Sequence, residues 1–122
     1  MDLKAAESEK IKHYLCYIYA DAPFTAKDKE LLDSLTNISL QQLTPLRVLH
    51  RRTLMLREKI IHRLKLHTVS RCSAILEVWA SAGTYIKEFV HGDLGRTTPN
   101  IGQLVGKRVD ILQLDVGSLK EG

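Results

Sequence analysis

The 122-residue sequence lacks several features that would assign it to a class at once. It has only two cysteines, Cys16 and Cys72, which lie far apart in apolar surroundings and are expected to be buried free thiols. Two cysteines alone cannot form a zinc site, so no metal site is predicted. No apolar run approaches the roughly 20 residues that cross a bilayer, and the charged N-terminus lacks the apolar stretch of a secretory signal. We expect an intracellular protein, of the cytoplasm or the nucleus, without membrane contact.

Sequence motifs for common catalytic chemistries are also missing. The chain contains no GxxxxGK[ST] phosphate loop, no GxGxxG, no HExxH and no nucleophile elbow. His91 and Asp93 could form an acid–base pair, but a turn after a helix explains them more simply. The composition, 44% hydrophobic and 26% charged, is that of an ordinary globular domain. A chain of this length buries a core without disulfides.

Basic residues are concentrated in one segment. Between residues 47 and 71, eight lysines and arginines stand against a single acid, Glu58, so the segment carries a formal charge of +7 and the remainder carries −3. Such clustering is typical of proteins that bind a polyanion, although a solvated charged face has the same composition. The candidate phosphate-binding residues are Arg47, Arg51, Arg52, Arg57, Lys59, Arg63 and Lys65.

The pattern of apolar residues predicts an α+β fold with a mixed, mostly antiparallel sheet and flanking helices. Strands are expected over 13–20, 72–80 and 109–116, and a short strand or turn over 37–43. Residues 92–102 are rich in turn formers and predict a loop.

Two helices are expected between these strands. Thr25 is placed to cap the first, which runs to about Leu35 and has Asp28 in its first turn. The second covers residues 84–91, and its apolar side chains are expected to face inward. Those side chains are Ile86, Phe89 and Val90.

Residues 53–69 fit two periodicities. With period two, four basic residues and Ile61 share one face of a strand; they are Arg57, Lys59, Arg63 and Lys65. With period 3.6, the apolar residues form one face of an amphipathic helix; they are Leu56, Ile60, Ile61 and Leu64. Periodicity alone leaves both structures open.

The sequence AGTYIKEF around Gly83 is more specific. A small residue followed by glycine lets a strand turn abruptly into a helix, and Thr84 is expected to cap that helix. Lys87 would then project from the first helical turn and be able to pair with an acidic group in a cleft. A solvent-facing lysine at a helix start is the simpler alternative.

Three segments in this order, TPLRVLHRR, AGTYIKEFVHGDLGRTTPNIGQL and DILQLDV, closely resemble the C-terminal part of the Pus ten-type tRNA pseudouridine synthases of archaea and eukaryotes. The shorter GTYI-plus-basic core also resembles the third motif of the TruB-type synthases. The resemblance covers about residues 10–116 and implies a pseudouridine synthase catalytic fold. It implies an enzyme that flips a uridine out of tRNA, in the T-arm, and isomerises it with an aspartate nucleophile and without metal or cofactor.

The same resemblance assigns three site residues. Tyr14, in KIKHYLCYI, matches the active-site tyrosine, whose ring stacks on the flipped base; Tyr17 and Tyr19 are its competitors in sequence. Lys87 matches the basic residue that pairs with the catalytic aspartate, where TruB-type enzymes have arginine; lysine keeps the charge and loses the bidentate fork. Leu104 matches an apolar residue that packs against the pocket.

One family feature has no match in the chain. The catalytic aspartate of the family lies upstream, in an arginine-glutamate-aspartate-type segment followed by Gly-Arg-Pro, whereas Asp21, Asp28 and Asp33 all follow Tyr14. We therefore expect residues 1–122 to be the C-terminal portion of a catalytic domain and to be inactive alone. The alternative is a non-catalytic RNA-binding or scaffold fragment. The resemblance also favours a strand over 53–69, with its basic face along the RNA.

Overall fold

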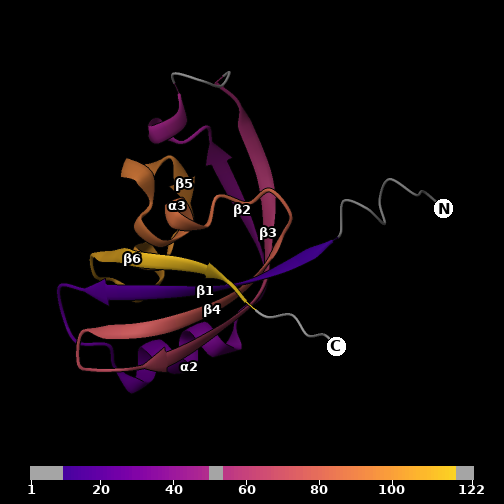
Figure 1. Cartoon of the computed structure of the whole chain (residues 1–122). Coiled ribbons are helices and arrows are strands. Elements are labelled where there is room, and N and C mark those ends of the chain that lie inside the picture. Colours follow the sequence, from indigo (N-terminus) through magenta and orange to yellow (C-terminus); the bar gives the residue numbers. More distant parts are fainter. Residues whose placement is uncertain (1–9, 50–53, 118–122) are drawn as a thin grey trace.

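The computed structural model describes residues 10–49 and 54–117, which form a curled sheet with helices packed against it (Figure 1). The strands are β1 (Ile11–Ala20), β2 (Thr36–Leu43), β3 (Leu56–Thr68), β4 (Ser73–Ser81), β5 (Thr97–Thr98) and β6 (Val109–Val116). The helices are α2 (Ala26–Ser34), α3 (Ile86–His91) and α4 (Ile101–Val105), and short 3-10 turns are η1 (Leu46–Val48) and η2 (Asp93–Gly95). The predicted α+β class is confirmed.

The sheet has six strands in the order β5-β2-β3-β4-β1-β6, and each pairing between described strands is antiparallel. Residues 53–69, which fitted either periodicity, contain the strand β3, and 37–43 lies within β2. The predicted loop over 92–102 is only partly right, because it contains η2, β5 and the start of α4. The strand predicted over 13–20 is two residues longer at its start, since β1 begins at Ile11.

The start of α2 is built as the sequence indicates. The Thr25 hydroxyl accepts a hydrogen bond from the Asp28 backbone N–H at 3.1 Å, and the Asp28 carboxylate accepts one from the Thr25 N–H at 2.9 Å. This reciprocal capping box satisfies two backbone donors that a helix start otherwise leaves unpaired. The Lys107 ammonium group also contacts Asp28, which ties the start of α2 to the turn before β6.

The core lies on one face of the sheet. Alternate residues of the neighbouring strands β1 and β4 are buried there, among them Cys16 and Ile18 of β1 and Leu76 and Val78 of β4. The helices cover this face with Leu32, Phe89, Val90 and Ile101. Both cysteines are free, as predicted, but only Cys16 is fully buried, and burial raises its thiol pKa to about 12.

A bulge divides β3. Ile61 is paired with Ala80, but Arg63 is paired with Trp79, so β3 has one extra residue between these two positions relative to β4. Directly paired residues of an antiparallel sheet lie on the same face. Ile61 therefore shares the core face with Leu64, three residues further on, and both are buried.

This bulge overturns the predicted single basic face of β3. Lys59 is paired with Leu40, a core residue, and Arg57 is paired with the buried Gln42, so both cations lie on the core face of the sheet. Arg63 and Lys65 lie on the opposite face, beside Trp79 and Glu77 of β4. The sequence-based prediction assumed a regular strand, in which residues two apart share a face, and therefore placed all four cations in one row. The extra residue in β3 breaks this alternation.

Candidate functional site

The chain turns sharply after β4. Gly83 has a positive φ of +83°, and a Cβ atom at this position would lie 3.1 Å from the Lys59 ammonium nitrogen. That ammonium group donates a hydrogen bond to the Ala82 carbonyl oxygen at 3.3 Å. The backbone conformation therefore favours glycine here, whereas the end of the flexible Lys59 side chain could shift slightly to admit a Cβ atom.

Thr84 does not cap α3, contrary to the sequence-based prediction. Its hydroxyl donates to the Ser81 carbonyl oxygen at 2.7 Å, so it closes the turn after β4. A helix capped by Thr84 would begin at Tyr85, but α3 begins one residue later, at Ile86. Tyr85 is its N-cap residue, and no side chain makes a capping hydrogen bond. The expected inward side chains are confirmed, since Ile86, Phe89 and Val90 are all buried.

Gln42 of β2 holds the backbone at the start of α3. Its side-chain amide donates to the Tyr85 carbonyl oxygen at 2.9 Å, and its side-chain oxygen accepts from the Tyr85 N–H at 3.0 Å. The amide also donates to the Thr97 hydroxyl at 3.2 Å. Gln42 is only 1% exposed, so these bonds lie in an environment that strengthens them.

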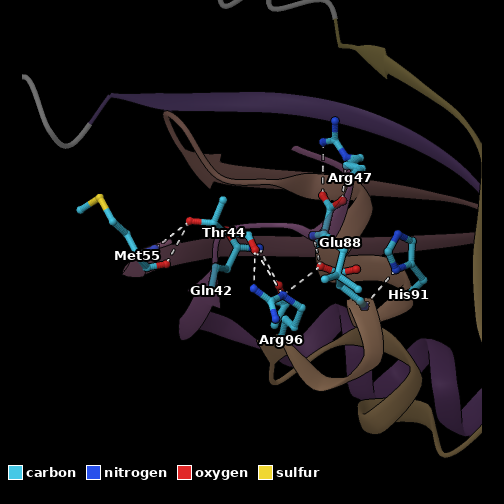
Figure 2. A network of polar contacts seen from close by, with 10 residues as sticks. Gln42, Thr44, Arg47, Met55, Glu88, His91 and Arg96 are labelled. Atoms are coloured by element: carbon cyan, nitrogen blue, oxygen red, sulfur yellow. Dashed lines mark hydrogen bonds and ion pairs between the residues drawn. The ribbon is translucent and has the colours of Figure 1, made fainter. Parts of the chain in front are cut away.

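Arg47 of η1 forms an ion pair with Glu88 of α3 (Figure 2). Its Nε lies 2.7 Å from Glu88 Oε2 and its Nη2 lies 3.3 Å from Glu88 Oε1, which makes a fork of two bonds. The Glu88 side chain is 2% exposed, whereas that of Arg47 is 51% exposed. The guanidinium carbon also lies 5.8 Å from the centre of the Tyr85 ring. The hydrogen bond to Glu88 raises the pKa of Arg47.

Lys87 lies between these two anchored positions. It occupies the first turn of α3, as predicted, and is exposed. Within residues 10–49 and 54–117, no hydrogen bond or ion pair holds its ammonium group. The arrangement therefore presents a cation on a fixed backbone, able to receive an acidic group.

Tyr14 and Leu104, the other two predicted site residues, both pack against the core. Tyr14 is half-buried on β1, paired with Val78 of β4 and Val116 of β6. It lies opposite the C-terminal half of β4 and so at the end of the sheet from which the turn to α3 departs. By alternation along β1, its competitors in sequence, Tyr17 and Tyr19, point to the opposite face.

His91 and Asp93 form a turn, the simpler of the two interpretations. The Asp93 backbone N–H donates to His91 Nδ1 at 3.0 Å, and its carboxylate accepts from the Leu46 N–H at 2.9 Å. The same carboxylate lies 3.7 Å from Arg96. Asp93 therefore fastens η1, which carries Arg47, to the segment after α3.

The predicted phosphate-binding residues are divided among several places. Arg57 and Lys59 lie on the same face of the sheet as Gln42. Arg63 and Lys65 lie on the opposite face. Arg47 forms an ion pair with Glu88. Arg51 and Arg52 lie outside the described residues. Sequence analysis missed Gln42 and Glu88, because a polar residue in a strand and an acid in a helix start both look solvent-facing.

Two further findings concern the described residues only. Among them, no group of three or more histidine, cysteine, aspartate or glutamate side chains is placed to hold a metal ion. None of the helices seen in this part of the chain is long and apolar enough to span a membrane.

The fold is similar to that of two chains of known structure. A chain in the crystal structure of a Cbf5–Nop10–Gar1 complex superposes with a TM-score of 0.67 at 20% identity, covering 97% of this chain and 34% of that one. A chain in the structure of an H/ACA RNP bound to a substrate RNA containing 2'-deoxyuridine superposes with a TM-score of 0.60 at 16% identity, covering 93% and 30%.

The chain belongs to the family described as "Pus10, C-terminal", whose profile matches residues 1–120. It is 47% identical over 117 residues to the tRNA pseudouridine synthase Pus10 of Mus musculus and 46% identical to that of Homo sapiens, covering 96% of this chain in both cases. It is 38% identical over 120 residues to the enzyme of Thermofilum pendens, covering 98% of this chain. The chain spans 22% of the two mammalian relatives and 27% of the archaeal one.

Proposed function

We propose that this chain is the C-terminal part of the catalytic domain of a tRNA pseudouridine synthase. The observation that carries the proposal is the family match over residues 1–120, which includes the GTYIK segment and its exposed, unpaired Lys87. Since the relatives are named tRNA pseudouridine synthase and are several times longer, we assign the activity to the whole parent protein.

The described residues supply part of the pocket. The reaction breaks the bond between uracil nitrogen and ribose and forms a bond between a uracil carbon and the same ribose carbon; the proton lost by that uracil carbon is balanced by one gained at the freed nitrogen. Lys87 pairs with the aspartate nucleophile, which the rest of the parent protein provides, and keeps it ionised. Tyr14 stacks on the flipped uracil, and Leu104 packs against the pocket. Arg57 and Lys59 contact tRNA phosphates beside this site.

The test compares two proteins on unmodified tRNA transcripts. We expect the full-length parent protein to form pseudouridine and the 122-residue chain to form none, because a tyrosine and a lysine cannot replace a carboxylate nucleophile. Pseudouridine is mapped by chemical labelling and reverse transcription. Product from the isolated chain would place the nucleophile within it, and a parent protein without product would contradict the proposal.

A second candidate function is RNA binding without chemistry, and the +7 segment is the observation that favours it. A binding module and an enzyme differ in what Lys87→Ala does in the parent protein. In a binding module the substitution lowers tRNA affinity by no more than the loss of about one phosphate contact would. In the enzyme it abolishes most of the single-turnover rate, because the buried carboxylate loses its counter-ion.

A further inference from the structure

We propose that Gln42, Arg47 and Glu88 are positioning residues that hold the α3 backbone on both sides of Lys87, and that Arg47 does this instead of binding a tRNA phosphate. The inference rests on the proposed function, since it assigns these residues to the same site. The three side chains come from β2, from η1 and from α3 itself; Arg47 and Glu88 point toward each other (Figure 2), and Gln42 bonds the Tyr85 backbone at the start of α3.

The first anchor lies two residues before Lys87. The Gln42 side chain bonds both the N–H and the carbonyl oxygen of Tyr85, at 3.0 and 2.9 Å, as a neighbouring strand would. Each backbone group of a buried segment needs a partner, and here one amide provides both. A residue that offers only a donor or only an acceptor leaves one of the two Tyr85 groups unpaired.

The second anchor lies one residue after Lys87. Glu88 is 1% exposed, and a carboxylate so deeply buried must be neutralised or hydrogen-bonded. The Arg47 fork does both, at 2.7 and 3.3 Å. Asp93 binds the N–H of Leu46, the residue before Arg47, and so keeps η1 in place against the same segment.

Together the two anchors fix the rotation of the first turn of α3. Lys87 therefore leaves the helix in one direction, while its own ammonium group keeps no partner among the described residues. A pre-oriented cation loses less freedom when the aspartate and the flipped uridine arrive. A guanidinium already shared with a buried carboxylate is poorly placed to hold a phosphate as well.

The experiment uses the full-length parent protein and single-turnover rates at saturating tRNA. We expect Arg47→Ala and Gln42→Ala to lower the rate about 10- to 100-fold, and Arg47→Lys to behave like Arg47→Ala, because lysine keeps the charge without the fork. The log–log salt slope of tRNA binding is expected to stay at its wild-type value, whereas loss of a phosphate contact lowers it by about one unit. Lys27→Ala, an exposed lysine on α2, is the matched control for charge removal.

A double variant tests whether Arg47 acts through Lys87. We expect Arg47→Ala/Lys87→Ala to be no slower than Lys87→Ala alone. Once Lys87 is absent, Arg47 has no ammonium group left to position, so its loss has no further effect on the rate. Rate losses of the two single variants that multiply in the double variant would overturn the inference. So would an Arg47→Ala variant whose salt slope falls by one unit while its rate stays unchanged. Circular dichroism and thermal midpoints confirm folding, and Glu88→Gln, which keeps the shape and one acceptor, replaces any variant that fails to fold. If Lys87→Ala itself keeps full activity, the proposed role of Lys87 fails first, and the inference falls with it.

Discussion

The two halves of β3 differ although they form one continuous strand. The half before the bulge, residues 56–61, pairs with β2 and turns Arg57 and Lys59 toward the face that carries the candidate site. The half after the bulge, residues 63–68, pairs with β4 and turns Arg63 and Lys65 away. A single extra residue therefore decides which cations can reach a ligand at the site.

The two halves also complete their hydrogen bonds differently. In the first half, the Ile60 N–H donates to the Ser81 hydroxyl at 3.1 Å, just where β4 ends. In the second half, side chains of α2 take the place of a neighbouring strand: the Leu66 N–H donates to Asp33 at 2.9 Å, and the Leu66 carbonyl oxygen accepts from Lys29 at 2.8 Å. The difference shows that the first half ends against the turn after β4, whereas the second half is completed by side chains of α2.

The largest expected effect separates the halves by stability. Leu66→Ala should lower the free energy of unfolding by about 2–5 kcal/mol, because the side chain is fully buried. Leu56→Ala, in the first half, should change it by less than about 0.5 kcal/mol, since that side chain is 59% exposed. Urea unfolding of the chain measures both. Similar losses for the two variants would contradict the burial of Leu66 and the exposure of Leu56.

The next effect separates the halves by RNA binding. Reversing Arg57 and Lys59 to glutamate should weaken tRNA binding by the parent protein about 10-fold or more and lower its log–log salt slope by roughly one unit per lost phosphate contact. Reversing Arg63 and Lys65 should change both quantities little. A filter-binding titration across salt concentrations measures them. Equal loss in the two double variants would mean that the bulge does not separate the cations functionally.

A smaller effect sharpens the account of the edge of β3. Asp33→Ala should lower the free energy of unfolding by about 1–3 kcal/mol, because it leaves the Leu66 N–H without its acceptor. The hydrogen bonds from Lys29 and from the Leu66 backbone hold the pKa of Asp33 below its usual range despite the opposing effect of burial. Asp115→Ala is the control, because the Asp115 carboxylate accepts hydrogen bonds from the Gln113 side chain and not from a backbone N–H. Equal unfolding energies for Asp33→Ala and the wild-type chain would exclude this role.

The smallest effect concerns pH and the second half of β3. Burial opposes ionisation of Glu77, but hydrogen bonds from His67 at 2.5 Å and His13 at 3.0 Å outweigh it and hold the pKa of Glu77 below its usual range. A carboxyl group whose pKa is lower in the folded state stabilises the protein at pH values above its unfolded-state pKa. This contribution disappears as the pH falls through the folded-state pKa. Glu77→Gln should therefore be less stable than wild type at neutral pH, with a difference that shrinks in acid. A constant difference across the titration would contradict it.

The sequence predicts features that depend on local chemistry. The Thr25–Asp28 capping box and the strand at 109–116 lie where the sequence places them, because a cap and a clean alternation are both encoded within a few residues. The capping role of Thr84 is wrong, because its hydroxyl bonds back to Ser81, a competing partner in the preceding turn. Sequence rules for helix caps do not predict which of two nearby backbone groups a threonine hydroxyl will bond.

Features that depend on distant segments are not predictable in this way. The bulge in β3 appears only in its register with β4, and nothing within 53–69 reveals it. Gln42 and Glu88 are buried by segments more than 40 residues away in the chain. The exposed position of Lys87 could be predicted, whereas the anchors on either side of it required the tertiary structure.

The side chains that close the second half of β3 have a consequence for behaviour in solution. A sheet edge with free N–H and carbonyl groups is a template on which another polypeptide can add a strand, and this is how many β-rich proteins begin to aggregate. At Leu66 both groups are occupied by Asp33 and Lys29 of α2. Helix α2 thus covers the sheet edge at this position, and its loss would leave both Leu66 backbone groups free to pair with another polypeptide.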